Sequence, residues 1–176
     1  MIPTTEECMK LLEKYKLPDN ILAHVTKVRD VAVRLAKELN NKGEHINIDL
    51  LNAAALLHDI DKMQTLGDKF PQHGYVSQKI LLKEGFSKDF AHLVLLHKAE
   101  HLVDMKYNHW EEKLLAYADS RVLHDKVVPF KKRYEYAVNK YPHLRSPKFQ
   151  EAKQKVLKLE EFIFSKLDIS PDDLND

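Results

Sequence analysis

Apolar residues recur at steps of three and four positions along most of the chain, and this spacing predicts α-helices. The clearest stripe comprises Ile21, Val25, Val28, Ala32, Leu35 and Leu39. A shorter segment, residues 50–57, is apolar on nearly every side and contains three consecutive alanines. A helix that lacks a polar face is buried in its protein, so we expect this segment at the centre of the fold.

Capping residues, glycines and prolines divide the pattern into separate helices. The expected N-cap residues are Thr4, Asp19 or Asn20, Asp49, Ser87 and Ser146. The predicted helices cover residues 5–16, 20–39, 50–58, 73–83, 88–96, 110–123, 130–141 and 147–167. No segment has the pattern of a strand, and the acidic tail from Asp168 is expected to fray. The sequence therefore predicts a compact all-α fold.

Composition narrows the class of protein. The 176 residues are 44% hydrophobic and 31% charged with a net charge of +1, which indicates one globular domain over residues 1–176. This charge gives no overall attraction to nucleic acid or to an anionic membrane. Cys8 is the sole cysteine, and neither a signal peptide nor an apolar stretch of about 20 residues is present. We expect a reduced, cytoplasmic protein.

Chemistry is concentrated in the dipeptide His58-Asp59, which ends the apolar segment. Burying an imidazole and a carboxylate without partners costs several kcal/mol, and a cation held between them removes this cost. His24, His73, His97 and Asp119 also lie on apolar faces of predicted helices. Helix bundles build metal sites from such groups. Each group alone also fits a structural role, such as a core histidine or an aspartate that caps a helix or pairs with an arginine.

The order of these residues resembles the HD superfamily of metal-dependent phosphohydrolases. The matching features are His24, the pair His58-Asp59, and Asp119 in Tyr117-Ala118-Asp119. His73 and His97 correspond to the two additional histidines of a subset with a two-metal site. The resemblance covers residues 20–123 and implies a helical HD-domain bundle, to which residues 124–167 add C-terminal helices and residues 168–176 an acidic tail.

The resemblance also implies a ligand set. His24, His58, Asp59 and Asp119 would hold one metal ion, and Asp59 would bridge to a second ion held by His73 and His97. Such ligands suit one or two ions of Mn, Fe, Co, Ni or Zn. Asp61 stands where the family usually has a small residue, and its role as a ligand, a cap or a deterrent to anionic substrates is open.

The implied activity is hydrolysis of a small phosphate ester, such as a nucleotide or dinucleoside polyphosphate, by a metal-activated water. Asp59 and Lys62 are the expected catalytic residues, and Lys62, Lys98 and Arg121 the expected phosphate contacts, although each of these cations also fits a solvated surface. The partner would be a small molecule, with no nucleic acid and no membrane, and the oligomeric state is open. The aromatic and basic run at residues 129–136 is interpreted as an exposed helix face.

Three alternatives remain open at this point. One is an HD-type di-iron oxygenase, which uses the same histidines and aspartates to activate O₂. Another is a non-catalytic module that binds a metal or a nucleotide. The third is a plain helical interaction protein in which the inward histidines are structural.

Overall fold

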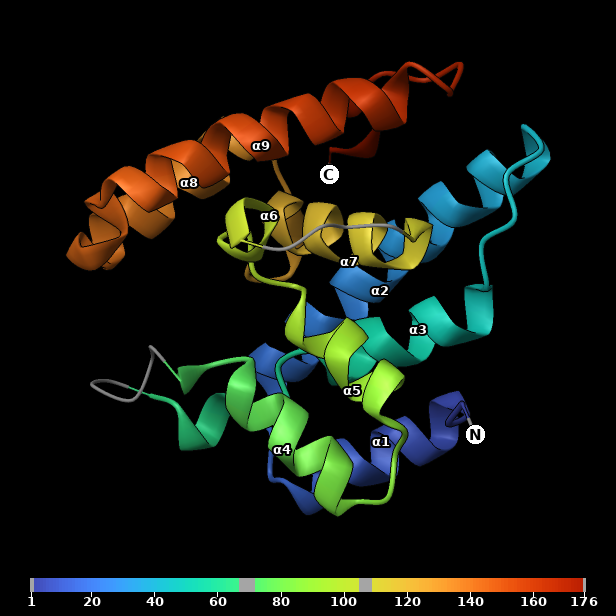
Figure 1. Ribbon diagram of the computed structural model, residues 1–176, viewed down its shortest axis with the longest axis vertical. Coiled ribbons are helices and arrows are strands. Elements are labelled where there is room, and N and C mark those ends of the chain that lie inside the picture. The colour runs from blue at the N-terminus through green and yellow to red at the C-terminus, as the bar shows by residue number, and fades with distance from the viewer. Residues whose placement is uncertain (1, 67–71, 105–108, 176) are drawn as a thin grey trace.

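The computed structural model describes residues 2–66, 72–104 and 109–175, and these residues form an all-α fold, as expected (Figure 1). Its helices are α1 (Thr5–Lys14), α2 (Asp19–Asn41), α3 (Ile48–Leu57), α4 (Tyr75–Lys83), α5 (Lys88–Leu95), α6 (His101–Asp104), α7 (Trp110–Arg121), α8 (Phe130–Lys140) and α9 (Pro147–Phe164). Short 3₁₀ turns cover Lys62–Gln64, Pro142–Arg145 and Pro171–Leu174. Among the described helices, none combines the length and the apolar character needed to cross a membrane.

The core is built around α2, α3 and α7, which pack against one another at the centre of the molecule (Figure 1). The three alanines of α3 are fully buried, which confirms the expectation from the sequence. Their small side chains let α2 approach closely, and Ala32 and Ala36 of α2 are also fully buried. In Figure 1, α1, α4 and α5 lie on one side of this centre, and α8 and α9 lie across the other.

Several predicted helix starts are confirmed, and two are wrong. The side chains of Thr4, Ser87 and Ser146 each accept a backbone N–H of the first helical turn. Helix α2 instead follows Pro18 without a side-chain cap. Helix α3 is capped by Asn47, whose side chain lies two positions before Asp49 and accepts the Leu50 N–H.

The C-terminal part of the chain departs most from the prediction. Helix α7 ends at Arg121, and a short antiparallel hairpin follows, in which β1 (Val122–Leu123) pairs with β2 (Lys126–Val127). The tail does not fray along its whole length, because Ser170 caps the turn Pro171–Leu174 and Leu174 is buried. This tail packs onto the same core as α2 and α7.

Candidate metal centre

Six side chains expected at the metal site meet in one place, and most of them lie at the ends of helices. They are His24 in the second turn of α2, His58 and Asp59 directly after α3, His73 just before α4, His97 just after α5, and Asp119 in the last turn of α7. Helix ends leave backbone groups free and allow the chain to turn. The centre therefore collects groups from five segments that are far apart in the sequence.

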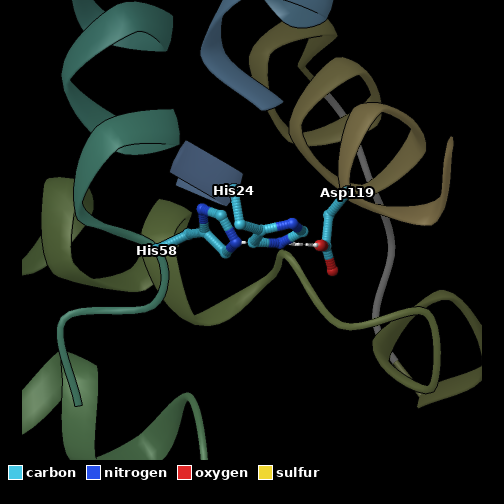
Figure 2. A group of neighbouring side chains, drawn as sticks. All are labelled: His24, His58 and Asp119. Atoms are coloured by element: carbon cyan, nitrogen blue, oxygen red, sulfur yellow. Dashed lines mark hydrogen bonds and ion pairs between the residues drawn. The ribbon is translucent and has the colours of Figure 1, made fainter. Parts of the chain in front are cut away.

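The first group consists of His24, His58 and Asp119, shown in Figure 2. Nε2 of His24 lies 3.1 Å from Oδ1 of Asp119, and Nε2 of His58 lies 3.7 Å from the same oxygen. The opposite nitrogens are held by backbone carbonyls: Nδ1 of His24 donates to His124 at 2.9 Å, and Nδ1 of His58 donates to Ala55 at 2.7 Å. Such bonds fix the orientation of an imidazole and leave its Nε2 available as a ligand.

Nε2 of His58 provides a test of whether a metal ion fits this site. This nitrogen is fully buried and has no hydrogen-bond partner among the described residues. It lies 3.7 Å from Oδ1 of both Asp59 and Asp119, which is too long for a hydrogen bond. A cation bound at about 2.1 Å from each atom spans such separations. The spacing and chemistry of these donors therefore fit a transition metal.

The second group consists of Asp59, His73 and His97. Nε2 of His73 lies 3.0 Å from Oδ1 of Asp59 and 3.1 Å from Nε2 of His97. Nδ1 of His97 donates to the Val94 carbonyl at 2.8 Å. Because Oδ1 of Asp59 also approaches His58 of the first group, Asp59 lies between the two sets of donors. This is the position that a bridging carboxylate requires.

Asp61 is buried beneath the second group and has a role that the sequence left open. Its Oδ1 accepts a hydrogen bond from Nδ1 of His73 at 2.7 Å. Its Oδ2 accepts the backbone N–H groups of Gly74 at 2.8 Å and Ser77 at 3.1 Å. Asp61 therefore caps the start of α4 and directs Nε2 of His73 toward Asp59. This contact also explains why α4 begins at Tyr75, whereas the sequence had predicted that this helix begins at His73.

The charges around the centre favour the ionised forms of Asp59 and Asp119, which are the forms that can bind a metal ion. Burial by itself raises the pKa of the Asp59 carboxyl, but Lys62 and the neighbouring imidazoles hold that pKa well below its usual value. Asp119 behaves alike, because His24 and His58 outweigh its burial and hold its pKa well below the usual value. Both carboxylates are thus ionised and able to bind a cation.

The pKa of His97 shifts in the opposite direction from the pKa values of His58 and His73. Burial lowers the pKa of His97 well below its usual value, and neighbouring His73 and His58 add to this effect. Burial also acts to lower the pKa values of His58 and His73, but Asp59 and other nearby carboxylates leave both pKa values raised. A metal ligand must be a neutral imidazole, so a cation bound here would displace protons from these two residues.

The two groups open onto a cleft, and the expected phosphate contacts are divided between the cleft and the core. Lys62 and Lys98 both line the cleft, and Nζ of Lys62 lies 3.2 Å from Oδ2 of Asp59. The expectation for Arg121 was wrong, because its side chain is fully buried away from the cleft. Its guanidinium donates to the carbonyls of Val128 and Pro171, so it joins the hairpin and the C-terminal tail to α7.

The other wall of the cleft comes from α8, α9 and the turn between them, and no residue of these elements was predicted at the site. The residues of this wall include Phe130, Arg133, Tyr134, Tyr136, Lys140, Tyr141, Phe149 and Lys153. The interpretation of residues 129–136 as an exposed helix face was right for Lys131, Lys132 and Glu135, which are exposed, and wrong for Phe130 and Tyr134, which are buried. The alternation of aromatic and basic residues was the available signal.

The chain is similar to curated proteins, two of which have names that refer to RNA modification. It is 29% identical to the tRNA (cytidine(56)-2'-O)-methyltransferase of Thermoplasma volcanium, over 93% of this chain and 47% of that protein. The protein of the same name from Picrophilus torridus is 28% identical, over 81% of this chain and 43% of that protein. An uncharacterized protein of Methanocaldococcus jannaschii is 33% identical, over 49% of this chain and 48% of that protein.

The chain thus spans about half the length of the curated relatives it matches. No solved structure matches it. Two of these relatives are enzymes that act on tRNA by name, and this contradicts the expected hydrolase of a small phosphate ester. It likewise contradicts the expectation of a small-molecule partner and no nucleic acid.

A family comparison agrees with the geometry of the centre. The HD domain family matches residues 21–123, which is more than half of the chain. The matched segment begins just before His24 and ends just after Asp119, so it contains both groups of donors. Inward histidines and carboxylates from different helices are the groups from which helical proteins build metal sites. The chain therefore belongs to the HD domain family.

Proposed function

We propose that this chain is a metal-binding HD domain that binds tRNA and takes part in the modification of tRNA in the cytoplasm. One observation carries the proposal: two buried sets of imidazoles and carboxylates, joined by Asp59, lie in a cleft that also contains Lys62 and Lys98. The names of the relatives supply the class of partner. Methyl transfer itself is not assigned to this chain, because the matched region is less than half of each methyltransferase.

The donors divide between two ions of Mn, Fe, Co, Ni or Zn. His24, His58 and Asp119 would hold one ion, His73 and His97 would hold the other, and Asp59 lies between the two sets and would contribute to both. When bound, such cations coordinate phosphate oxygens and neutralise their charge. Lys62 stands beside Asp59 and offers a further contact to the same phosphate. We infer that the ligand of this cleft is a phosphate group of the RNA chain.

The residues around the donors have supporting roles. Carbonyls at Ala55, Val94 and His124 hold the Nδ1 atoms of three histidines. Each of these histidines therefore presents Nε2 to the other donors of the centre in a fixed orientation. Lys62 stays protonated, because Asp59 and Asp119 outweigh burial and raise its pKa. It thus offers a positive charge to an incoming phosphate at any physiological pH.

The proposal is tested by measuring metal content and tRNA binding on the same samples. We expect one or two transition-metal ions per chain, most of them lost in Asp59→Ala and retained in the control Asp89→Ala, an exposed aspartate of α5. An unmodified tRNA transcript should bind the metal-loaded protein, and a chelator should weaken this binding about ten-fold or more. If the protein takes up no metal on reconstitution, or if the chelator leaves tRNA binding unchanged, the proposal is wrong.

A further inference from the structure

The wall formed by α8 and α9 lies outside the residues that match the HD domain family, yet it lines the same cleft as the metal donors. Figure 1 shows these two helices crossing one side of the α2, α3 and α7 core. A segment added to a family core at its cleft has the position from which specificity for a ligand is set. The chemistry of its side chains is therefore informative.

Tyr136, Lys140 and Tyr141 form one unit of this wall, which we call the tyrosine–lysine unit. Nζ of Lys140 lies 3.1 Å from Oη of Tyr136, and it lies 5.4 Å and 5.5 Å from the ring centroids of Tyr136 and Tyr141. The hydrogen bond with Tyr136 raises the pKa of Lys140, so the lysine is charged. One cation is thus held beside two phenol rings that are each half-buried.

The tyrosine–lysine unit is connected to the metal donors through the hairpin. The ring of Tyr136 meets the ring of His124 edge to face, with centroids 5.3 Å apart. The carbonyl of His124 is the group that holds Nδ1 of His24. The unit therefore contacts the residue whose carbonyl orients His24 of the first group of donors.

A second aromatic pair in the same wall has a different role. The rings of Tyr134 and Phe149 are stacked, with centroids 5.4 Å apart and an interplanar angle of 11°. Nζ of Lys153 lies 4.7 Å from the centroid of Tyr134, which is buried. These rings already cover each other and join α8 to α9. They position the wall, whereas Tyr136 and Tyr141 of the tyrosine–lysine unit line the cleft with partly exposed side chains.

We propose that the tyrosine–lysine unit recognises an unpaired nucleotide of RNA, with its base stacked on Tyr136 or Tyr141 and a flanking phosphate at Lys140. Proteins bind single-stranded RNA with aromatic rings for the bases and cations for the backbone. A base in a duplex is already stacked, so an unpaired base is the form that can reach such rings. This inference rests on the proposed function and specifies which part of the RNA the cleft receives.

The test uses a short single-stranded RNA that carries one 2-aminopurine, whose fluorescence falls when it stacks on an aromatic ring. Tyr136→Leu and Tyr141→Leu should each weaken binding about ten-fold or more, and the quenching should be lost in at least one of them. Tyr136→Phe keeps the ring and should bind nearly as the wild type does. The control is Tyr75→Leu, which removes an exposed phenol of α4 that does not line the cleft.

A second arm replaces the 2-aminopurine nucleotide with an abasic one. Removal of the base should weaken binding to the wild type but have little further effect in the affected tyrosine variant, because the ring and the base act as a pair. If both leucine variants bind the RNA as the wild type does, while tRNA binding remains metal-dependent, this inference fails and the proposed function stands. If the wild type binds no RNA, both fail.

Discussion

Replacement of Asp61 by asparagine tests how the second group of donors is held. Asp61 is fully buried and accepts three hydrogen bonds, one from Nδ1 of His73 and two from the backbone N–H groups of Gly74 and Ser77. Asparagine has nearly the same shape, but it offers one carbonyl oxygen and one NH₂ group in place of two acceptor oxygens. It therefore cannot satisfy all three donors.

The structure sets the size of the effect. If the NH₂ group faces the helix, the N–H groups of Gly74 and Ser77 lose their acceptor. If it faces His73, Nδ1 must become an acceptor, and the proton moves to Nε2, the atom 3.0 Å from Oδ1 of Asp59. Hydrogen bonds to a charged group contribute about 1.5–3 kcal/mol each. We expect the free energy of unfolding to fall by about 2–3 kcal/mol and metal affinity at the second group to fall 10–100-fold.

The free energy of unfolding is measured by chemical denaturation of the metal-free protein. Metal affinity is measured by titration of the metal in a calorimeter. The control is Asp89→Asn, which removes a carboxylate from the first turn of α5 at an exposed position outside the metal centre. The control should retain the wild-type metal affinity. An Asp61→Asn protein that binds two ions as tightly as the wild type would refute the reasoning, because Asp61 would then not orient His73.

Two further predictions concern the core and the pH dependence. Arg121→Ala should lower the free energy of unfolding by about 3 kcal/mol or more in chemical denaturation, because it removes the cation paired with Glu160 and leaves the carbonyls of Val128 and Pro171 without this donor; metal content should not change, and recovery of full stability by Arg121→Lys would contradict this account. The raised pKa values of His58 and His73 mean that their charged forms stabilise the metal-free fold at low pH, and this contribution is lost as pH rises through those values above the usual 6.5. Metal affinity should therefore increase as the pH rises through the pKa values of His58 and His73, because fewer protons must then be released on binding. The measurement is calorimetric titration of the metal at several pH values. Binding that does not depend on pH would show that these imidazoles are not ligands.

The sequence predicted the position of the centre because the donors lie on strongly patterned helices. His24 shares the apolar stripe of α2, and His58 follows a segment with no polar face, so both had to point inward. The order of the residues added the resemblance to the HD superfamily. Their mutual approach could be inferred only in outline, because the periodicity of a helix fixes which face is buried but not which helix lies opposite.

Other features could not be read from spacing. Asp61 caps α4 from 13 positions before Gly74, and a contact over this separation leaves no local pattern. Arg121 was expected beside the site because it follows Asp119 by two positions, but two positions on a helix place side chains on different faces. The wall from α8 and α9 depends on how these helices pack onto α7, which the chain's local preferences do not encode.

The charges of the centre explain why RNA binding should depend on the metal. Three helices, α3, α5 and α7, end at this centre, and the C-terminal end of a helix carries a partial negative charge. Asp59, Asp61 and Asp119 add three carboxylates, and Lys62 stands beside Asp59. The donor groups of the metal centre are therefore anionic when their imidazoles are neutral, whereas Arg133, Lys140 and Lys153 give the opposite wall of the cleft a positive charge. Two divalent cations at the donors would reverse the sign on the anionic side, so we expect the proposed RNA phosphate to reach this side of the cleft only in the metal-loaded protein.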